Sequence, residues 1–161
     1  MWFLALNKST TYRNLIMWFQ LLLGHLVGDY ILQPEWMALN KSKNTKIGWY
    51  AAIIHCLIYT FAVCLFMWDF DLIWIVVVFF SHFFIDKYSL AEWYLVKING
   101  RSLSKYLRKM DSPKLGKEFR EYLNSTNGMK VLQGGFTAVV YTVVDNTMHL
   151  VLMWGAYNLI Y

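Results

Sequence analysis

The chain has 161 residues, of which 58% are hydrophobic, 19% aromatic and only 16% charged, and its net charge is +5. A soluble domain is typically about 45–50% apolar and about 25% charged, so this composition argues against an ordinary soluble protein and favours one membrane domain. In so apolar a chain the basic excess favours anionic lipid headgroups, rather than nucleic acid, as the charged partner.

The apolar segments predict an all-α bundle of four transmembrane helices. A bilayer core requires about 20 apolar residues per helix. Four stretches meet this requirement, at about 14–33, 47–68, 72–90 and 135–159. Pro34 ends the first stretch, and the third can continue along the membrane interface as far as Ile98.

A basic insert over 99–133 separates the third and fourth stretches. Two short amphipathic patterns occur in it, on either side of Pro113. Helices of this kind tend to lie on an anionic membrane surface. Two interpretations remain open: a solvated basic loop that orients the protein, or a lid that binds lipid headgroups.

The distribution of basic residues predicts the orientation. The first link carries Lys41, Lys43 and Lys46, and nine Lys or Arg residues lie between Lys97 and Lys130. The second link and the tail after the fourth stretch carry none. By the positive-inside rule, we expect a multi-pass membrane protein with links one and three in the cytoplasm and both termini outside.

All four histidines fall in different predicted spans, and three of them have an aspartate four residues away. The residues are His25 with Asp29, His55, His82 with Asp86, and Asp145 with His149. Residues at i and i+4 lie on the same face of a helix. Each pair can therefore bind one metal ion, or the carboxylate can orient the imidazole.

Energetic cost and depth both predict that these groups converge. A buried aspartate in a membrane helix costs about 2.5–3.5 kcal/mol, so each one must face the bundle interior and be compensated. A divalent cation compensates several carboxylates at once. With links one and three on the same side, all seven side chains can meet in the cytoplasmic half of the bundle.

Three interpretations of the His/Asp cluster follow from these residue types: a metal site, a proton or ion pathway, or metal-free contacts between helices. Imidazole and carboxylate without thiolate suit zinc, iron or manganese. Seven candidate ligands exceed the four of a mononuclear zinc site, so two ions are one option, and one ion with outer aspartates is the other.

Other polar residues share the faces of the cluster and are candidates for substrate binding. They are Gln33, Tyr59, Lys87 and Asn146. Lys87 can reach a phosphate group at the interface. The simpler interpretations are that Gln33 caps a helix end and that the Lys87 ammonium extends to the membrane surface.

The motifs GHLVGDYILQPEWMALNKSKN, His55, SHFFIDKY and DNTMH together resemble a group of small bacterial and phage integral-membrane proteins. This group is the domain-of-unknown-function family 3307, and the resemblance covers nearly the whole chain. It implies no established activity. The residues that it singles out are His25, Asp29, Gln33, His55, His82, Asp86, Asp145 and His149.

The leading functional hypothesis is a membrane-embedded metal-dependent hydrolase that acts on a lipid or lipid-linked phosphate. A bound metal would lower the pKa of water to about 7, and Asp29 or Asp145 would act as general base. No nucleophilic Ser or Cys motif occurs. The alternatives are a metal or proton transporter, which would need to be a homo-oligomer, a di-iron oxidase, and a non-enzymatic membrane protein with a structural metal.

Overall fold

The computed structural model of the protein describes residues 2–102 and 128–161, with side chains for 12–102 and 135–161. Every regular element in these ranges is a helix, as the sequence predicts, and no strand occurs in them. The chain divides into two compact units. The first comprises Met1–Tyr88 and Met148–Tyr161, and the second comprises Ser89–Thr147.

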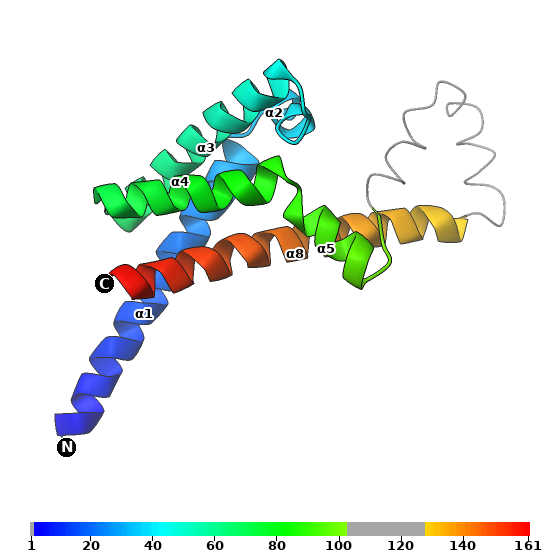
Figure 1. Ribbon diagram of the computed structural model, residues 1–161. Coiled ribbons are helices and arrows are strands. Elements are labelled where there is room, and N and C mark those ends of the chain that lie inside the picture. The colour runs from blue at the N-terminus through cyan, green and yellow to red at the C-terminus, as the bar shows by residue number, and fades with distance from the viewer. Residues whose placement is uncertain (1, 103–127) are drawn as a thin grey trace. The chain divides into compact units, whose positions relative to one another are not determined.

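Figure 1 shows the helices in chain order. They are α1 (Trp2–Leu26), the π-helix η1 (Val27–Ile31), α2 (Glu35–Asn40), α3 (Lys46–Met67), α4 (Leu72–Lys87), α5 (Leu90–Ile98) and α8 (Gly128–Ile160). The segments predicted at 47–68 and 135–159 correspond to α3 and to most of α8. The segment predicted at 14–33 is shared by α1 and η1, and the one at 72–90 contains a helix break after Lys87.

Side-chain caps determine where α3 and α4 begin. Thr45 accepts a hydrogen bond from the amide of Gly48 at 3.1 Å. Asp71 accepts two amide bonds from the first turn of α4, at 2.8 and 3.3 Å. Such caps satisfy amides that have no partner within the helix. Helix α3 ends at Trp68, whose φ of 52° is left-handed and stops the helical path.

Two glycines allow the first segment to approach α3 closely. A Cβ atom on Gly24 would lie 2.9 Å from the Cα of Val63, and one on Gly28 would lie 2.7 Å from the Tyr59 ring. Small residues permit this kind of close backbone packing between apolar helices. Helix α3 is therefore central to the first unit: α1, η1, α2 and α4 all contact it.

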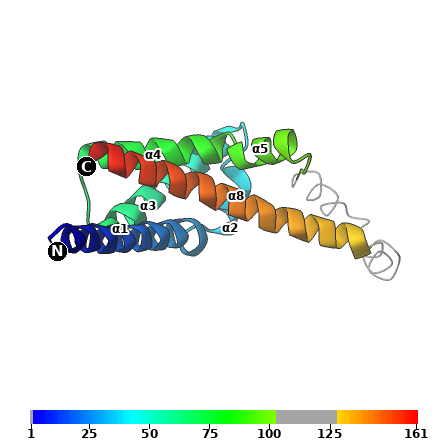
Figure 2. The same ribbon diagram turned by 90° about the horizontal axis from the view of Figure 1, so that it is seen from below.

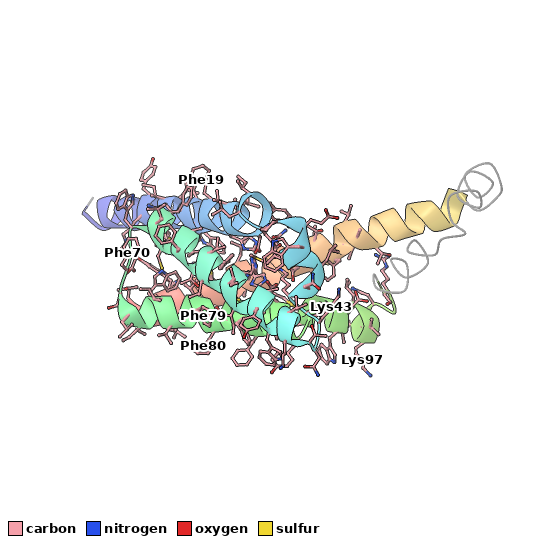
Figure 3. The ribbon with its side chains drawn as sticks, turned by 90° about the horizontal axis from the view of Figure 1, so that it is seen from above. Phe19, Lys43, Phe70, Phe79, Phe80 and Lys97 are labelled. Carbon is pink, nitrogen blue, oxygen red and sulfur yellow. The ribbon has the colours of Figure 1, made fainter. Side chains whose placement is uncertain are left out.

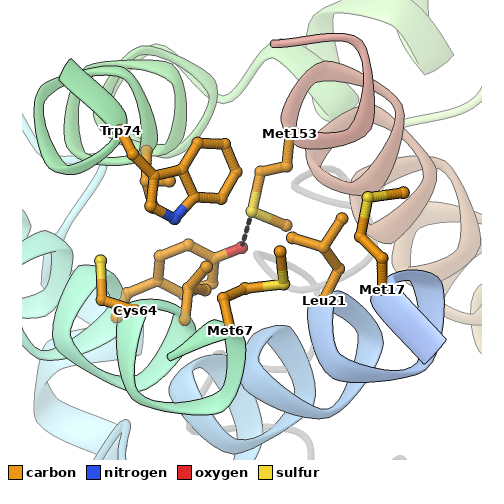
Figure 4. Close-up of a cluster of buried hydrophobic side chains, with 9 residues drawn as sticks. Met17, Leu21, Cys64, Met67, Trp74 and Met153 are labelled. Atoms are coloured by element: carbon orange, nitrogen blue, oxygen red, sulfur yellow. Dashed lines mark hydrogen bonds between the residues drawn. The ribbon is translucent and has the colours of Figure 1, made fainter. Parts of the chain in front are cut away.

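The apolar core of the first unit joins four helices (Figure 4). It consists of Met17, Leu21, Tyr59, Val63, Cys64, Met67, Trp74, Val78 and Met153. Trp154 stacks on Trp18 with ring centroids 5.6 Å apart, and Tyr157 meets Trp74 edge-on at 5.4 Å. The last turns of α8 therefore lie beside α1 and the start of α4 (Figure 2).

The exterior of the first unit is also apolar. Phe19, Phe70 and Phe80 are between 50% and 61% exposed, and Figure 3 shows them around the helices. Two described helical segments are long and apolar enough to cross a membrane, α3 and Gly135–Ile160 of α8. Counting α4 and α5 as one broken span gives a third. The described residues thus contain two or three candidate spans, and a bundle of four spans stays a prediction.

The second unit contains α5 and the earlier part of α8. Ser102 donates a hydrogen bond to Glu92 at 2.9 Å, and the Arg101 guanidinium lies over the Phe136 ring at 4.8 Å. Both amphipathic patterns of the predicted insert lie at 103–127, outside the described residues. Helix α8 already begins at Gly128, inside the range 99–133 that was expected to be insert.

Candidate metal centre

The first unit brings together six of the seven predicted ligands. Helix α1 supplies His25, η1 supplies Asp29, α3 supplies His55, α4 supplies His82 and Asp86, and α8 supplies His149. The four histidine side chains are no more than 2% exposed, and Asp86 is 5% exposed. A charged or polar cluster buried this deeply must satisfy its groups internally.

Four side-chain atoms form the centre of this cluster: Asp29 Oδ1, His55 Nε2, His82 Nε2 and Asp86 Oδ2. All four lie within 4.8 Å of one another. His55 Nε2 is 3.1 Å from Asp29 Oδ1 and 3.0 Å from Asp86 Oδ2. His82 Nε2 is 3.3 Å and 3.1 Å from the same two oxygens. The two imidazole nitrogens are 2.8 Å apart.

These distances match the edges of a tetrahedral metal site. Zinc binds nitrogen and oxygen ligands at about 2.0–2.1 Å, which places the ligand atoms of a tetrahedron about 3.3 Å apart. The five separations above span 2.8 to 3.3 Å. Asp29 Oδ1 is also buried and accepts no hydrogen bond. The four residues therefore fit a divalent cation, which would satisfy that oxygen.

A π-helical turn positions Asp29. Residues Val27–Ile31 form η1, and the amide of Leu32 donates to the carbonyl of Val27 at 2.9 Å, five residues back. A π turn is wider than an α turn and changes the direction of the side chains that it carries. Asp29 nevertheless remains close to His25, with Oδ2 3.4 Å from His25 Nδ1.

Gln33 orients His55. The amide of Gln33 is placed so that its nitrogen donates to the Asp29 carbonyl at 3.2 Å. Its oxygen then accepts from His55 Nδ1, also at 3.2 Å. With its proton on Nδ1, His55 presents the Nε2 lone pair to the centre. A metal-binding histidine usually donates its other ring nitrogen to an outer acceptor in this way.

His149 supports the other side of the centre. Its Nδ1 is 3.0 Å from Nδ1 of His82, and its Nε2 is 3.5 Å from Asp86 Oδ1. A proton on His82 Nδ1 can therefore be donated to His149, which leaves His82 Nε2 free to bind a cation. His25 and His149 thus contact the outer oxygens of the two carboxylates, whereas His55 and His82 face the centre.

Tyr59 forms one wall of the cluster. Its ring stacks on His82 with centroids 3.5 Å apart, and its hydroxyl lies 2.9 Å from His25 Nδ1. The same hydroxyl donates to Met153 Sδ at 3.3 Å. Tyr59 is completely buried, so these contacts hold the histidines in place. The predicted contact of Tyr59 with a substrate stays a prediction.

Lys41 is a site residue that the sequence interpretation missed. Its ammonium lies 2.6 Å from Asp86 Oδ2, 3.4 Å from His55 Nε2 and 3.0 Å from the Gln33 side-chain oxygen. The sequence analysis counted Lys41 only among the basic residues of link one that predict the orientation. One signal was available: buried aspartates require a cation, and Lys41 lies shortly after Gln33 in the chain.

Lys87 is buried against the backbone of link one. It is 5% exposed, and its ammonium donates to the backbone carbonyls of Lys43 at 2.8 Å and Lys41 at 3.4 Å. It also lies 4.4 Å from the centre of the Trp49 ring. These contacts hold link one in place. Binding of a headgroup by Lys87 stays a prediction.

Asp145 and Asn146 belong to the second unit. Asp145 lies one helical turn before His149 on α8. The predicted roles of Asp145 in metal binding and catalysis, and of Asn146 in substrate binding, stay predictions.

The chain matches the family described as "Protein of unknown function (DUF3307)" over residues 17–160. It belongs to the DUF3307 family. No curated protein and no solved structure matches the chain. The part of the chain matched to the DUF3307 family contains all six residues of the cluster together with Gln33 and Lys41.

Proposed function

We propose that this protein is a membrane-embedded metal-dependent hydrolase that acts on a lipid or lipid-linked phosphate. The observation that carries the proposal is the set of four donor atoms from η1, α3 and α4 at the spacing of a tetrahedral site. The apolar exterior and the candidate spans support a membrane location. The proposed bundle has α1 with η1, α3, α4 with α5, and α8 as its four spans.

A divalent cation at this centre would lower the pKa of a bound water to about 7 and polarise a phosphoryl oxygen. The protein groups have separate tasks. The other three donor residues would hold the cation, which leaves a fourth position for water. Asp29 Oδ1, which accepts no hydrogen bond, can take the proton of that water, while His25 lies 3.4 Å from the other oxygen of the carboxylate. Lys41 can attract an anionic headgroup, because its ammonium lies 3.4 Å from His55 Nε2 and 2.6 Å from Asp86 Oδ2.

The test begins with the protein purified in detergent, loaded with zinc, iron or manganese and then desalted. Metal content is measured by mass spectrometry, and phosphate release is measured with phosphatidic acid and with an isoprenyl phosphate as substrates. We expect His55→Ala to lose the metal. We expect Asp29→Asn to keep most of the metal and to lose at least about 100-fold in turnover, the usual contribution of a general base.

Asp71→Asn is the matched control, because Asp71 caps α4 outside the centre. It should retain both metal and turnover. A protein that binds metal but hydrolyses neither substrate in any metal form contradicts the proposed activity. A protein that binds none of the three metals contradicts the metal centre itself.

A proton pathway is the second candidate, and the line of imidazoles favours it. His149, His82 and His55 follow one another at ring-nitrogen distances of 3.0 and 2.8 Å, and His82 uses both of its nitrogens. Such chains can pass protons between buried groups. Vesicles that contain the protein and a trapped pH dye would then dissipate a pH gradient, and His82→Phe would abolish this dissipation.

A structural metal is the third candidate. Four protein ligands complete a tetrahedral site, as in structural zinc sites, whereas catalytic sites keep one position open. In this case chelation would unfold the protein, and Asp29→Asn would lower metal content and thermal stability together. Retention of metal by Asp29→Asn with loss of turnover distinguishes the hydrolase from this alternative.

A further inference from the structure

A groove runs between α3 and α4, the helices that carry His55, His82 and Asp86. It encloses about 380 Å³, which is within the usual range of about 300–1,000 Å³ for ligand pockets. Figure 3 shows Phe79 and Phe80 on α4 and Phe70 in the link between α3 and α4. The lining side chains are Leu57, Thr60, Phe61, Cys64, Phe70, Ile75, Val76, Phe79 and Phe80.

The chemistry of the lining is apolar except at one residue, Thr60. Its side chain is 5% exposed, and its hydroxyl oxygen is buried without a hydrogen-bond partner. A threonine within a helix usually bonds to the carbonyl four residues back. Thr142 and Thr147 of α8 do so, at 3.0 and 2.7 Å. Thr60 therefore carries an unused buried hydroxyl in the wall of the groove.

The residues that line the groove are near neighbours of cluster residues on the same two helices. Thr60 follows Tyr59, whose ring stacks on His82, and Phe79 precedes His82 by one helical turn. From Leu57 to Cys64 the groove extends about 10 Å along α3, at about 1.5 Å per residue. A molecule with its polar end at the His/Asp cluster would thus place its remainder in the groove.

The rim of the groove favours a narrow occupant. Leu57, Phe61 and Phe80 are 57%, 59% and 50% exposed, and they project on both sides. A partner helix is about 10–12 Å in diameter and packs best against small residues, which this rim lacks. A hydrocarbon chain is narrower than a helix and does not need small residues to pack against. Hydrocarbon chains would also surround α3 and α4 if these helices cross a membrane.

We propose that the groove between α3 and α4 binds the hydrocarbon tail of a lipid whose anionic head lies at the His/Asp cluster, and that Thr60 donates a hydrogen bond to the first oxygen that joins head and tail. This inference rests on the proposed function and makes it more specific, because it identifies the substrate as a lipid that is held by its tail. It assigns Thr60 as a binding residue.

The test uses the full-length protein in nanodiscs that contain a small fraction of phosphatidic acid with a diazirine in its acyl chain. After illumination, the labelled residues are identified by peptide mass spectrometry. We expect labels concentrated on groove residues such as Val76 and Phe80. Val76→Trp, which fills the groove, should lower this labelling at least fivefold, and Thr60→Val should lower it about threefold.

Ile73→Trp is the matched control, because Ile73 lies on α4, is 61% exposed and does not line the groove. It should leave labelling unchanged. Asp29→Asn should also be labelled normally, since binding of the tail does not require turnover. Labelling of the groove without hydrolysis in any metal form would support lipid binding in the groove and would contradict the proposed hydrolase activity. Labels spread evenly over Ile73 and the groove, or no effect of Val76→Trp, would overturn the inference.

Discussion

The ammonium of Lys41 lies 2.6 Å from Oδ2 of Asp86, one of the four atoms that converge at the candidate metal centre. The same ammonium lies 3.4 Å from His55 Nε2. A positive side chain thus occupies one edge of the site, where a divalent cation would repel it. Lys41 and a metal ion must compete for Asp86.

This competition predicts that removal of the Lys41 charge strengthens metal binding. Two unit charges about 4 Å apart interact by about 4 kcal/mol at an effective dielectric constant of about 20, so relaxation of the chain would still leave a measurable effect. We expect Lys41→Met to tighten zinc binding at least tenfold, as measured by competition with a chromogenic chelator.

Lys43→Met is the control for this experiment, because the Lys43 ammonium bonds to Asn40 at 3.0 Å outside the cluster. Its zinc affinity should equal that of the unmodified protein. If Lys41→Met bound zinc more weakly, the lysine would be supporting the site instead of competing for it.

Gln33 is predicted to affect metal affinity without touching the metal. Its side-chain oxygen accepts the proton of His55 Nδ1 and so directs Nε2 to the centre. Loss of such an outer contact typically costs about 10–100-fold in metal affinity. We expect Gln33→Leu to weaken zinc binding by about tenfold. We expect Gln33→Glu, which keeps an acceptor for the His55 proton, to bind zinc nearly as tightly as the unmodified protein. An unchanged affinity in Gln33→Leu would show that packing alone orients His55.

Gly24 tests the close packing of α1 on α3. An added Cβ would meet the Val63 backbone at 2.9 Å, and backbone cannot move aside as a flexible side chain can. Overpacking typically costs about 1–3 kcal/mol. We expect Gly24→Ala to lower the unfolding temperature in detergent, measured by loss of the monodisperse peak on heating.

Gly155→Ala is the comparison for Gly24→Ala, since nothing lies within 4 Å of its added Cβ. Alanine is favoured over glycine inside a helix by up to about 1 kcal/mol, so this variant should be as stable as the original or more so. Equal unfolding temperatures for the two variants would contradict the packing of α1 on α3.

A variant of Lys87 tests whether this residue stabilises the fold or binds a headgroup. Removal of its ammonium leaves the carbonyls of Lys41 and Lys43 without this donor. We expect Lys87→Met to lower thermal stability and to leave the KM for a lipid phosphate nearly unchanged. Lys46→Met, at the exposed start of α3, is the control. A raised KM at normal stability would instead support binding of a headgroup by Lys87.

The sequence was sufficient to predict the contacts that follow from helical spacing. His25 meets Asp29 at 3.4 Å and His82 meets Asp86 at 3.1 Å, as residues four apart on a helix should. Their convergence with His55 was predicted by two arguments. Buried aspartates on separate helices need compensating groups, and the predicted spans place these residues at a similar depth. Both arguments use only the sequence.

Other parts of the centre depend on tertiary structure. Lys41 reaches Asp86 because α2 and the following turn bring link one against α3 and α4. No periodic pattern in the sequence predicts this contact between Lys41 and Asp86. The π turn at Asp29 has the same apolar composition as an α-helix, so hydropathy cannot reveal it. The contacts of Lys87 with the carbonyls of Lys41 and Lys43 likewise join segments far apart in the chain, so helical spacing does not predict them.

The widened turn at Val27–Ile31 has a consequence for length variants of this chain. A π turn holds one more residue than the α-helical path that it replaces. Deletion of Tyr30 would therefore let the segment close into a regular α-helical turn while the residues on either side, Gln33 among them, keep their places. Deletion of a residue between His25 and Asp29 would instead rotate Asp29 by about 100° away from His25. The chain can thus lose a residue within this turn and keep the acid and the amide at the same centre, although the loss of a residue just before it would separate them.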